Sequence, residues 1–448
     1  MTVTYHADLA WRGGESVVAN VRIEVANGFI AAVTEGVAPR SGDERISGVV
    51  IPGLVNAHSH AFHRVLRGRT HNGDGDFWSW RNPMYDIANS LTPENYSDLA
   101  AMVYAEMTLA GITGVGEFHY VHHNLDGSTY NNPNEMGVAV VEAARRAGIR
   151  LALLDVAYLH AGLDQPIPLP EQQRFADKNI DAWLDRVDRL GEGGDNWTVG
   201  LAPHSIRAVY PDELDEVVGA RYGRVVHVHV SEQPAENDAC IAATGKTPTE
   251  VLADIGLLGS FATAVHATHL TSNDIELLGT SKTTVCLCPT TERDLADGIG
   301  PASALVKAGA VLALGSDSHA VIDLFEEARA VELNQRLITS RRGLHRPCDL
   351  LASATSGGAH SLGWAEHGSR IGIQPGAPAD FIAISLNSTR LASFSAESAV
   401  ACIVYSAAPA DVSDVWVSGN RIVEHGLHTK IEDVVGGLRN AIAQVVRI

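Results

Sequence analysis

Short apolar runs rich in β-branched residues alternate with longer helical patterns between about residue 51 and residue 365. Eight of these runs predict strands, at 50–58, 111–119, 149–158, 197–205, 224–232, 263–269, 283–289 and 310–318. Segments between them predict helices, among them 93–110, 137–148 and 323–338. Eight strand–helix alternations predict a TIM-like (β/α)8 barrel, in which parallel strands are surrounded by a ring of helices.

The two ends of the chain have a different pattern. Residues 17–33 show short alternating runs broken by Gly and Asn, which are typical of antiparallel strands, and β character returns after residue 366. The N-terminal strands are too few to fold alone. We therefore expect residues 1–50 and 366–448 to form one small composite β-domain beside a catalytic barrel of residues 51–365.

Potential metal ligands stand at the ends of three of the predicted strands, just past their apolar runs. They are His58 and His60 in NAHSH, His229 in HVHVSE and Asp317 in GSDSH. The carboxyl ends of barrel strands lie on one face, and residues two apart on a strand point to the same side. Three imidazoles and one carboxylate suit zinc, which keeps a position for water in catalytic sites. The pattern predicts a metal-assisted hydrolase; buried, purely structural histidines are the alternative for the NAHSH pair.

Charge and composition restrict the partners and the location. A net charge of -20 argues against nucleic acid or an anionic membrane as a partner. No apolar segment approaches the ~20 residues that cross a bilayer, and the N-terminus lacks the features of a secretory signal. Five cysteines, an odd number, fit a reducing compartment. We expect a cytoplasmic protein, with a homodimer as the default oligomer.

Longer motifs resemble those of a known family. IPGLVNAHSH, His-x-x-Glu at 229–232, His266, Asp317 and a Gly-Ala-x-Ala-Asp-Phe turn at 376–381 resemble the amidohydrolase superfamily over nearly the whole chain. Within it, SHAFHRVLRG, FWSWRNPMY, GEFHYVHH, HSIRAV and VHATH are similar to formimidoylglutamate deiminases. Those enzymes release ammonia from N-formimino-L-glutamate in histidine degradation and leave N-formyl-L-glutamate. The resemblance implies this reaction, a small anionic substrate derived from an amino acid, and one divalent metal ion, with zinc expected.

The resemblance also implies catalytic roles. Asp317 would complete the metal ligands and accept a proton from the attacking water, unless it only caps a loop. Glu232 would pair with a cationic formimino nitrogen and carry protons to the leaving ammonia, unless it is solvated. His266 would hydrogen-bond the attacking water or the tetrahedral centre, and His269 is disfavoured because it lies past the strand end. His229 is preferred to His227 as ligand because it is nearer the strand end.

Substrate selection is expected to come from arginines, because planar guanidinium groups bind carboxylates through paired hydrogen bonds. Arg207 follows a predicted strand and Arg81 lies in the loop after the first metal strand. By sequence alone either could be a surface residue. The resemblance implies that both contact substrate carboxylates and that His204 and Tyr120 add hydrogen bonds. His63 stands where the family pattern Ser-His-Ala-Phe-Gln has glutamine, so we expect it to line the substrate site with altered reach and charge.

The sequence is also compatible with other functions and with a second metal site. A deaminase of a heteroaromatic base could use the same metal, glutamate and histidine, although it would have little use for two arginines. Another N-formimino amino acid could be the substrate. A non-catalytic barrel is disfavoured because no ligand position is lost. A second metal site at His119, His122 and His123 is disfavoured because no carboxylate or cysteine stands at a suitable spacing.

Overall fold

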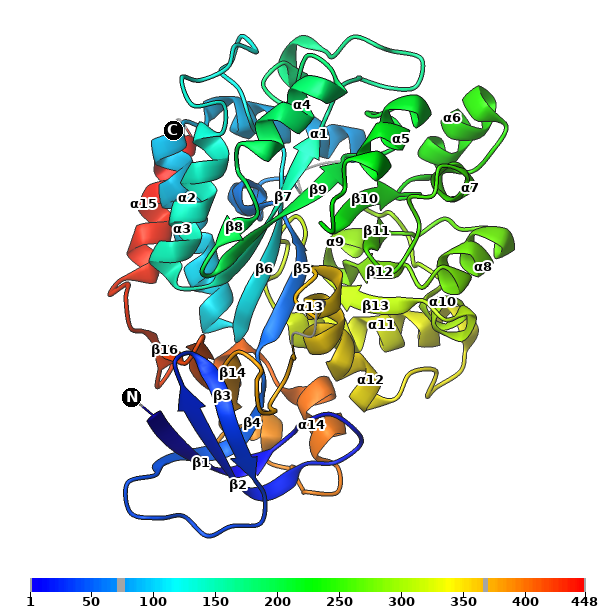
Figure 1. The fold of residues 1–448 in the computed structure, drawn as a ribbon. Coiled ribbons are helices and arrows are strands. Elements are labelled where there is room, and N and C mark those ends of the chain that lie inside the picture. Colours follow the sequence, from blue (N-terminus) through cyan, green and yellow to red (C-terminus); the bar gives the residue numbers. More distant parts are fainter. Residues whose placement is uncertain (1, 71–76, 366–369, 447–448) are drawn as a thin grey trace.

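The computed structural model describes residues 2–70, 77–365 and 370–446, and it contains a closed barrel with a separate sheet below it (Figure 1). Eight parallel barrel strands follow one another in chain order. They are β5 (Leu54–Ser59), β6 (Ile112–His119), β7 (Arg150–Ala157), β9 (Trp197–Pro203), β10 (Val226–Val230), β11 (Ala262–His266), β12 (Thr284–Leu287) and β13 (Val311–Leu314), with β8 (Gly193–Gly194) paired to β9. The predicted (β/α)8 fold is confirmed.

Backbone hydrogen bonds beside the predicted ligands close the barrel. Ser59, at the end of β5, pairs with Asp317, which follows β13. The Asp317 N–H donates to the His58 carbonyl at 3.0 Å, and the His60 N–H donates to the Asp317 carbonyl at 3.1 Å. The seam of the barrel therefore holds three of the predicted ligands in one fixed backbone arrangement.

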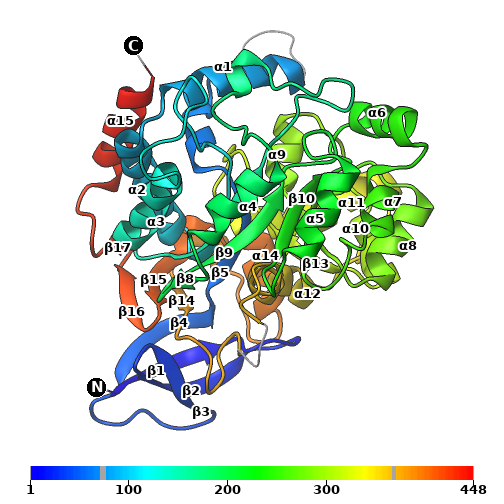
Figure 2. The same ribbon diagram turned by 45° about the horizontal axis from the view of Figure 1, so that its top comes forward.

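Helices connect the strands and surround the barrel (Figure 2). They are α1 (Phe77–Ser90), α2 (Pro93–Leu109), α3 (Glu135–Ala147), α4 (Ile180–Asp188), α5 (Pro211–Gly219), α6 (Pro234–Thr244), α7 (Pro248–Asp254), α8 (Ser272–Thr280), α9 (Pro289–Asp294), α10 (Ala302–Ala308) and α11 (Leu324–Thr339), with short turns η1 (Ala61–Leu66) and η2 (Pro170–Gln172). The expected helices at 93–110, 137–148 and 323–338 correspond to α2, α3 and α11. No helix in the described ranges is long and apolar enough to span a membrane.

The second sheet combines strands from both ends of the chain. Its N-terminal strands are β1 (Thr2–Ala10), β2 (Val18–Ala26), β3 (Phe29–Thr34) and β4 (Glu44–Pro52), and its C-terminal strands are β14 (Phe381–Ile384), β15 (Val412–Val417), β16 (Asn420–Glu424) and β17 (Leu427–His428). β4 pairs with β14, and the rings of Tyr5, Phe381 and Trp416 pack together in the core. The expected small β-domain from both termini is confirmed, whereas its limits at 1–50 and 366–448 stay a prediction.

The C-terminal region also adds helices to the barrel. α14 (Ala399–Ser406) packs on α11 and α12 (Pro347–Ala352), and α15 (Val434–Val445) packs on α2. The turns η4 (Thr389–Leu391) and η5 (Pro409–Asp411) flank α14. The π-helical turn η3 (Ser353–Gly357) and α13 (Gly358–Ser361) follow α12 in the chain. Both pack against β5 and β13. Leu362, just after α13, lies against Gly116 of β6, so this segment covers the barrel.

The single strand expected at 50–58 is two strands. β4 ends at Pro52 in the terminal sheet, and β5 begins at Leu54 in the barrel. A Cβ atom on the intervening Gly53 would lie 2.1 Å from Thr113 Oγ1, so only glycine fits at this junction. The last four residues of β4 and all of β5 are buried, and a continuous apolar run therefore hides the point at which the chain passes from one sheet to the other.

Candidate metal centre and active site

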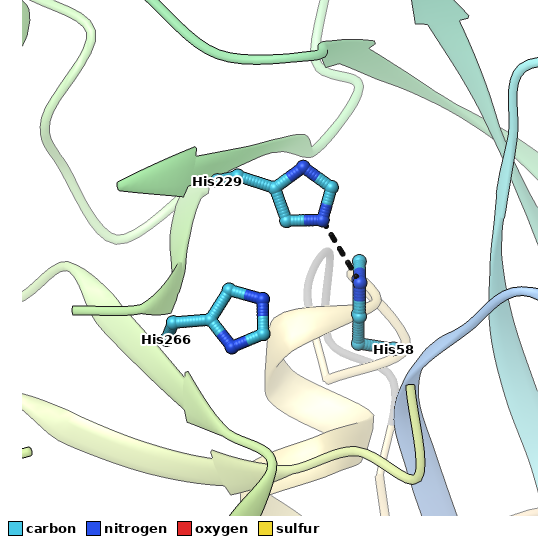
Figure 3. Close-up of side chains that lie close together, drawn as sticks. All are labelled: His58, His229 and His266. Atoms are coloured by element: carbon cyan, nitrogen blue, oxygen red, sulfur yellow. Dashed lines mark hydrogen bonds between the residues drawn. The ribbon is translucent and has the colours of Figure 1, made fainter. Parts of the chain in front are cut away.

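The four predicted ligands converge at the carboxyl ends of the barrel strands. His58 Nε2 lies 3.1 Å from His229 Nε2 and 3.5 Å from Asp317 Oδ1. His60 Nε2 lies 3.3 Å from the same Asp317 oxygen. Ligand atoms about 2.0–2.1 Å from a tetrahedral zinc ion are about 3.3 Å apart, so these three pairs match the spacing of two ligands on one such ion. The potential ligands form two groups that share His58: one with His60 and Asp317, the other with His229 and His266. Figure 3 shows His58 and His229 turned toward one another, with His266 beside them.

Hydrogen bonds on the far side of two imidazoles orient them. His60 Nδ1 donates to the Phe118 carbonyl at 3.0 Å, and His229 Nδ1 donates to the His204 carbonyl at 3.1 Å. In each ring Nε2 then keeps its lone pair and faces the cluster, as metal-binding histidines do. Burial lowers the pKa of His60 to about 3, which keeps this ring in the neutral form that ligates a metal.

His227, the rival of His229, points away from the cluster. Its Nε2 donates to the Ser361 carbonyl at 2.9 Å, in the segment that packs against β5 and β13. His269, the rival of His266, is also occupied elsewhere, because its Nε2 donates to the Asp297 carbonyl at 2.7 Å. The structure therefore brings His229 and His266 together and leaves both alternatives outside the cluster.

His266, the last residue of β11, lies among carboxylates. Its Nε2 is 3.6 Å from Glu232 Oε1 and 3.9 Å from Asp317 Oδ2, and its Nδ1 is 3.5 Å from Glu292 Oε1. Burial by itself would lower the pKa of His266, but these carboxylates raise it well above its usual value. A ring held between acids on both sides can donate a hydrogen bond toward the cluster and still be oriented from behind.

Two acidic residues at the site were not singled out by the sequence analysis. Glu292, on α9, faces His266 and accepts the Cys288 N–H at 2.8 Å. Glu236, on α6, is buried and its Oε2 accepts the Glu232 N–H at 3.1 Å. Neither follows a strand directly, so the strand-end signal that identified Glu232 and His266 could not find them.

The backbone is strained at two of the converging residues. His266 has φ 68° and Asp317 has φ 41°, in the left-handed region that non-glycine residues rarely adopt. Such conformations persist where the surrounding structure imposes them, and they cluster at functional sites. Here they turn each side chain out of its strand end toward the shared centre.

The substrate-binding candidates lie around the same pocket. It is lined by His60, His63, Arg81, Tyr120, His204, Arg207, His229, Glu232, His266 and Asp317, together with residues not singled out from the sequence: Trp80, Met84, Tyr85, Tyr158, Phe175, Leu295 and Ser318. Of the predicted site residues, only His58 does not line the pocket, because it is fully buried beneath the other ligands. The structure thus brings together catalytic, ligand and arginine candidates from widely separated parts of the sequence.

The two arginines reach the pocket from different elements. Arg81 lies on α1, with its Nη2 3.5 Å from Tyr158 Oη. Arg207 follows β9 and interacts electrostatically with Glu236 and Glu232. Both are partly buried pocket residues, so the alternative that they are ordinary surface arginines does not hold.

His63 lies between a ligand and the substrate side of the pocket. Its ring centroid is 4.6 Å from that of His60, and its Nε2 is 2.7 Å from Tyr120 Oη. Burial lowers the pKa of His63 well below its usual value, so the ring is neutral near pH 7. The expected pH-dependent charge at this position is therefore suppressed.

Two of the three histidines around Tyr120 have polar partners outside the ligand cluster, whereas the ring nitrogens of buried His119 make no hydrogen bond among the described residues. His122 Nε2 donates to the Val156 carbonyl at 2.9 Å, and His123 Nε2 lies 3.2 Å from Asp177 Oδ1. Asp177 is in turn paired with Arg186. In the part of the chain that the structure describes, every group of three or more closely placed potential metal ligands includes His58 or His266.

Comparison with known proteins agrees with this geometry. A family model described as the amidohydrolase family matches residues 49–422. The chain belongs to the amidohydrolase family. It is 36% identical over 423 residues to formimidoylglutamate deiminase from Pseudomonas aeruginosa, with 91% of this chain and 92% of the relative covered. The similarity to formimidoylglutamate deiminases predicted from the motifs is confirmed, and the protein is a hydrolase that acts on carbon–nitrogen bonds.

Two further matches show the breadth of this family. The chain is 28% identical to a 5-methylthioadenosine/S-adenosylhomocysteine deaminase from Pelotomaculum thermopropionicum, covering 93% of this chain and 90% of that one. The crystal structure of an amidohydrolase from Brucella melitensis superposes with a TM-score of 0.91 at 34% identity, covering 99% of this chain and 100% of that one. The chain is thus similar over nearly its whole length to proteins whose names give different substrates.

Proposed function

We propose that this amidohydrolase removes ammonia from N-formimino-L-glutamate and forms N-formyl-L-glutamate, a step of histidine degradation. The observation that carries the proposal is the placement of Arg81 and Arg207 in the same pocket as the ligand cluster. A substrate with two carboxylates and one hydrolysable carbon–nitrogen bond matches two guanidinium groups beside a hydrolytic centre. The 36% identity to a formimidoylglutamate deiminase supports the same assignment.

The ligand cluster is proposed to hold one divalent ion, with zinc expected. His58, His60, His229 and Asp317 supply the nitrogen and oxygen donors that zinc prefers, and the distances from His58 to His229 and from Asp317 to His58 and His60 suit ligands of a single ion. When bound, such an ion lowers the pKa of a coordinated water and so supplies a nucleophile at neutral pH. The same donors could hold iron or another divalent ion, and metal availability would then decide.

The protein's own groups account for the proton transfers. A bond forms between the water oxygen and the formimino carbon, and the bond from that carbon to the terminal nitrogen breaks. Water gives up two protons as the new carbonyl forms. The nitrogen of the cationic formimino group gains one of them and departs as ammonia, and the other proton is released to solvent. Asp317 accepts one proton, and Glu232, 3.6 Å from His266, passes a proton to the leaving nitrogen. His266 donates a hydrogen bond to the oxygen that becomes negative.

The substrate carboxylates are proposed to lie on the side of Arg81 and Arg207, with hydrogen bonds from His204 and Tyr120. The His204 ring centroid is 4.9 Å from that of His229 and 4.9 Å from that of Tyr158, whose hydroxyl lies 3.5 Å from Arg81 Nη2, so His204 lies between the ligand cluster and the Arg81 side of the pocket. His63, held by Tyr120, completes that wall. We further propose a cytoplasmic homodimer that acts on a small molecule, without nucleic acid or membrane partners.

The direct test is ammonia release by zinc-loaded protein from N-formimino-L-glutamate, N-formimino-L-aspartate and guanine under identical conditions. Rapid release from the glutamate compound alone is expected. Release from guanine alone would instead support a deaminase of a heteroaromatic base. The name of the 28% identical relative, a 5-methylthioadenosine/S-adenosylhomocysteine deaminase, is consistent with that alternative. Release from the aspartate compound alone would support the same hydrolytic reaction on a substrate with a shorter amino-acid side chain.

Metal removal is expected to abolish turnover and to destabilise the fold. Without an ion, three buried imidazoles and a carboxylate face one another with no shared partner. Dialysis against a chelator should therefore lower Tm by at least about 3 °C, because an ion that binds only the folded state stabilises it by mass action. Calorimetry before and after zinc is added back measures this effect, and an unchanged Tm with full activity in metal-free protein would contradict the metal site.

Replacement of His63 by glutamine is expected to be tolerated. A glutamine amide can keep a hydrogen bond to Tyr120, and the neutral His63 ring contributes no charge that would be lost. We expect KM for N-formimino-L-glutamate to change less than about tenfold, with kcat within about threefold. Steady-state kinetics of His63→Gln decides this, and a loss of turnover above a hundredfold would assign His63 a role that glutamine cannot fill.

A further inference from the structure

Two phenols and a glutamine form a buried unit beside the arginines. Tyr158 immediately follows β7, Tyr85 lies on α1, and Gln172 ends the turn η2 in the loop between β7 and α4. Tyr85 and Tyr158 line the pocket with Arg81 and Arg207, and Gln172 is fully buried behind them. None of these three was singled out from the sequence.

The hydrogen bonds of Gln172 fix the direction of its amide. The Leu169 N–H donates to Gln172 Oε1 at 2.8 Å, so this atom must be the carbonyl oxygen and Nε2 must be the NH₂ group. The two hydrogens of Nε2 are then directed to Tyr85 Oη and Tyr158 Oη, each 2.9 Å away. The Gln172 amide therefore acts only as a donor toward both phenols.

Each phenol must in consequence direct its own proton elsewhere. A tyrosine hydroxyl has a single hydrogen, and an oxygen that accepts from Gln172 cannot donate back to it. Arg81 Nη2 also points to Tyr158 Oη, at 3.5 Å, and it too is a donor. Burial raises the pKa of Tyr85 to about 12, so that its proton is retained at neutral pH. Among the residues that the structure describes, no hydrogen bond runs from either hydroxyl to a protein acceptor, so two O–H donors remain for a group inside the pocket.

We infer that Gln172 is a positioning residue that turns the hydroxyls of Tyr85 and Tyr158 into donors for a substrate carboxylate. The Tyr158 ring centroid is 4.9 Å from that of His204, which in turn is 4.9 Å from that of the ligand His229. Tyr158 thus lies one ring beyond His204 from the ligand cluster. The inference deepens the proposed function and rests on it for the identity of the substrate.

This arrangement would select a carboxylate in two ways: through the positive charge of the arginines, and because all of the groups that face it are hydrogen-bond donors. A carboxylate only accepts hydrogen bonds, so it satisfies two phenols and two guanidinium groups together. An amide or an amino group in the same place would direct hydrogens at these donors and leave some of them unpaired. Unpaired buried donors cost binding free energy, and this penalty discriminates more strongly than apolar contact does.

The test uses glutarate, a dicarboxylate without a hydrolysable group, titrated calorimetrically into the zinc-loaded protein at pH 8. We expect Tyr85→Phe and Tyr158→Phe each to raise the Kd about tenfold, and the double variant about a hundredfold. Gln172→Glu is the decisive variant, because a carboxylate can still accept the Leu169 N–H and anchor the loop. It would accept the phenol protons instead of donating, and we expect it to weaken binding at least as much as the double variant.

Kinetics separates this positioning role from a purely structural one. With N-formimino-L-glutamate, the three single variants should raise KM by the same factors while kcat stays within about threefold. Tyr405→Phe, on the remote α14, is the matched control and should change neither constant. If wild-type protein binds glutarate but has no deiminase activity, the proposed function fails and the inference stands. If wild-type protein does not bind glutarate, or if all variants bind it as wild type does, the inference is overturned.

Discussion

Replacement of Glu232 by glutamine is expected to lower kcat for ammonia release from N-formimino-L-glutamate at least about a thousandfold. Glutamine keeps the size of the side chain but can neither accept nor return a proton. Glu232 is not among the four proposed ligands, so the variant should still bind one equivalent of zinc. Steady-state kinetics together with metal analysis by atomic absorption measures both quantities on the same preparation.

A matched control makes this result specific. Glu276 is exposed on α8, away from the pocket lining, and Glu276→Gln removes an equal charge. It should keep kcat and metal content at wild-type values. Normal turnover by Glu232→Gln would remove this residue from the mechanism, whereas loss of its zinc would show that Glu232 supports the metal instead of moving protons.

The strand-end residues of the site could be predicted from sequence for a physical reason. In a barrel, the carboxyl ends of all strands lie on one face, so a polar residue directly after an apolar run is already placed near the others. His58, His229, His266 and Asp317 all meet this condition. The preference for His229 over His227 followed from the same rule. A side chain at the end of a strand projects from the barrel, whereas His227, two residues earlier, donates a hydrogen bond to Ser361 in the segment that covers the barrel.

Residues on helices and loops could not be placed in the same way. Tyr85 reaches the pocket from α1, and Gln172 reaches the phenols from a long loop whose path depends on tertiary contacts. Glu292 and Glu236 lie on the helices that follow β12 and β10, where an acidic residue is usually solvated. Arg81 and Arg207 were assigned only through the resemblance to a family. The boundary between β4 and β5 at Gly53 could not be predicted, because the residues on both sides of it are buried.

Replacement of Arg207 by methionine is expected to lower kcat/KM for N-formimino-L-glutamate by about a hundredfold or more. The protein carries a net charge of -20, so an anionic substrate is bound against an unfavourable overall field and depends on local positive charge. Arg207 already offsets the buried Glu236 and nearby Glu232, and without it those acids would repel a carboxylate. The loss should therefore appear mainly in KM, measured at constant ionic strength.

An arginine outside the pocket provides the control for this prediction. Arg189 is exposed after α4, and Arg189→Met changes the net charge by the same amount. If the general field dominated, both variants would raise KM equally; if Arg207 binds the carboxylate, only its variant will. An unchanged kcat/KM in Arg207→Met would refute the carboxylate role. The dicarboxylate assignment would then rest on Arg81 and the phenols alone.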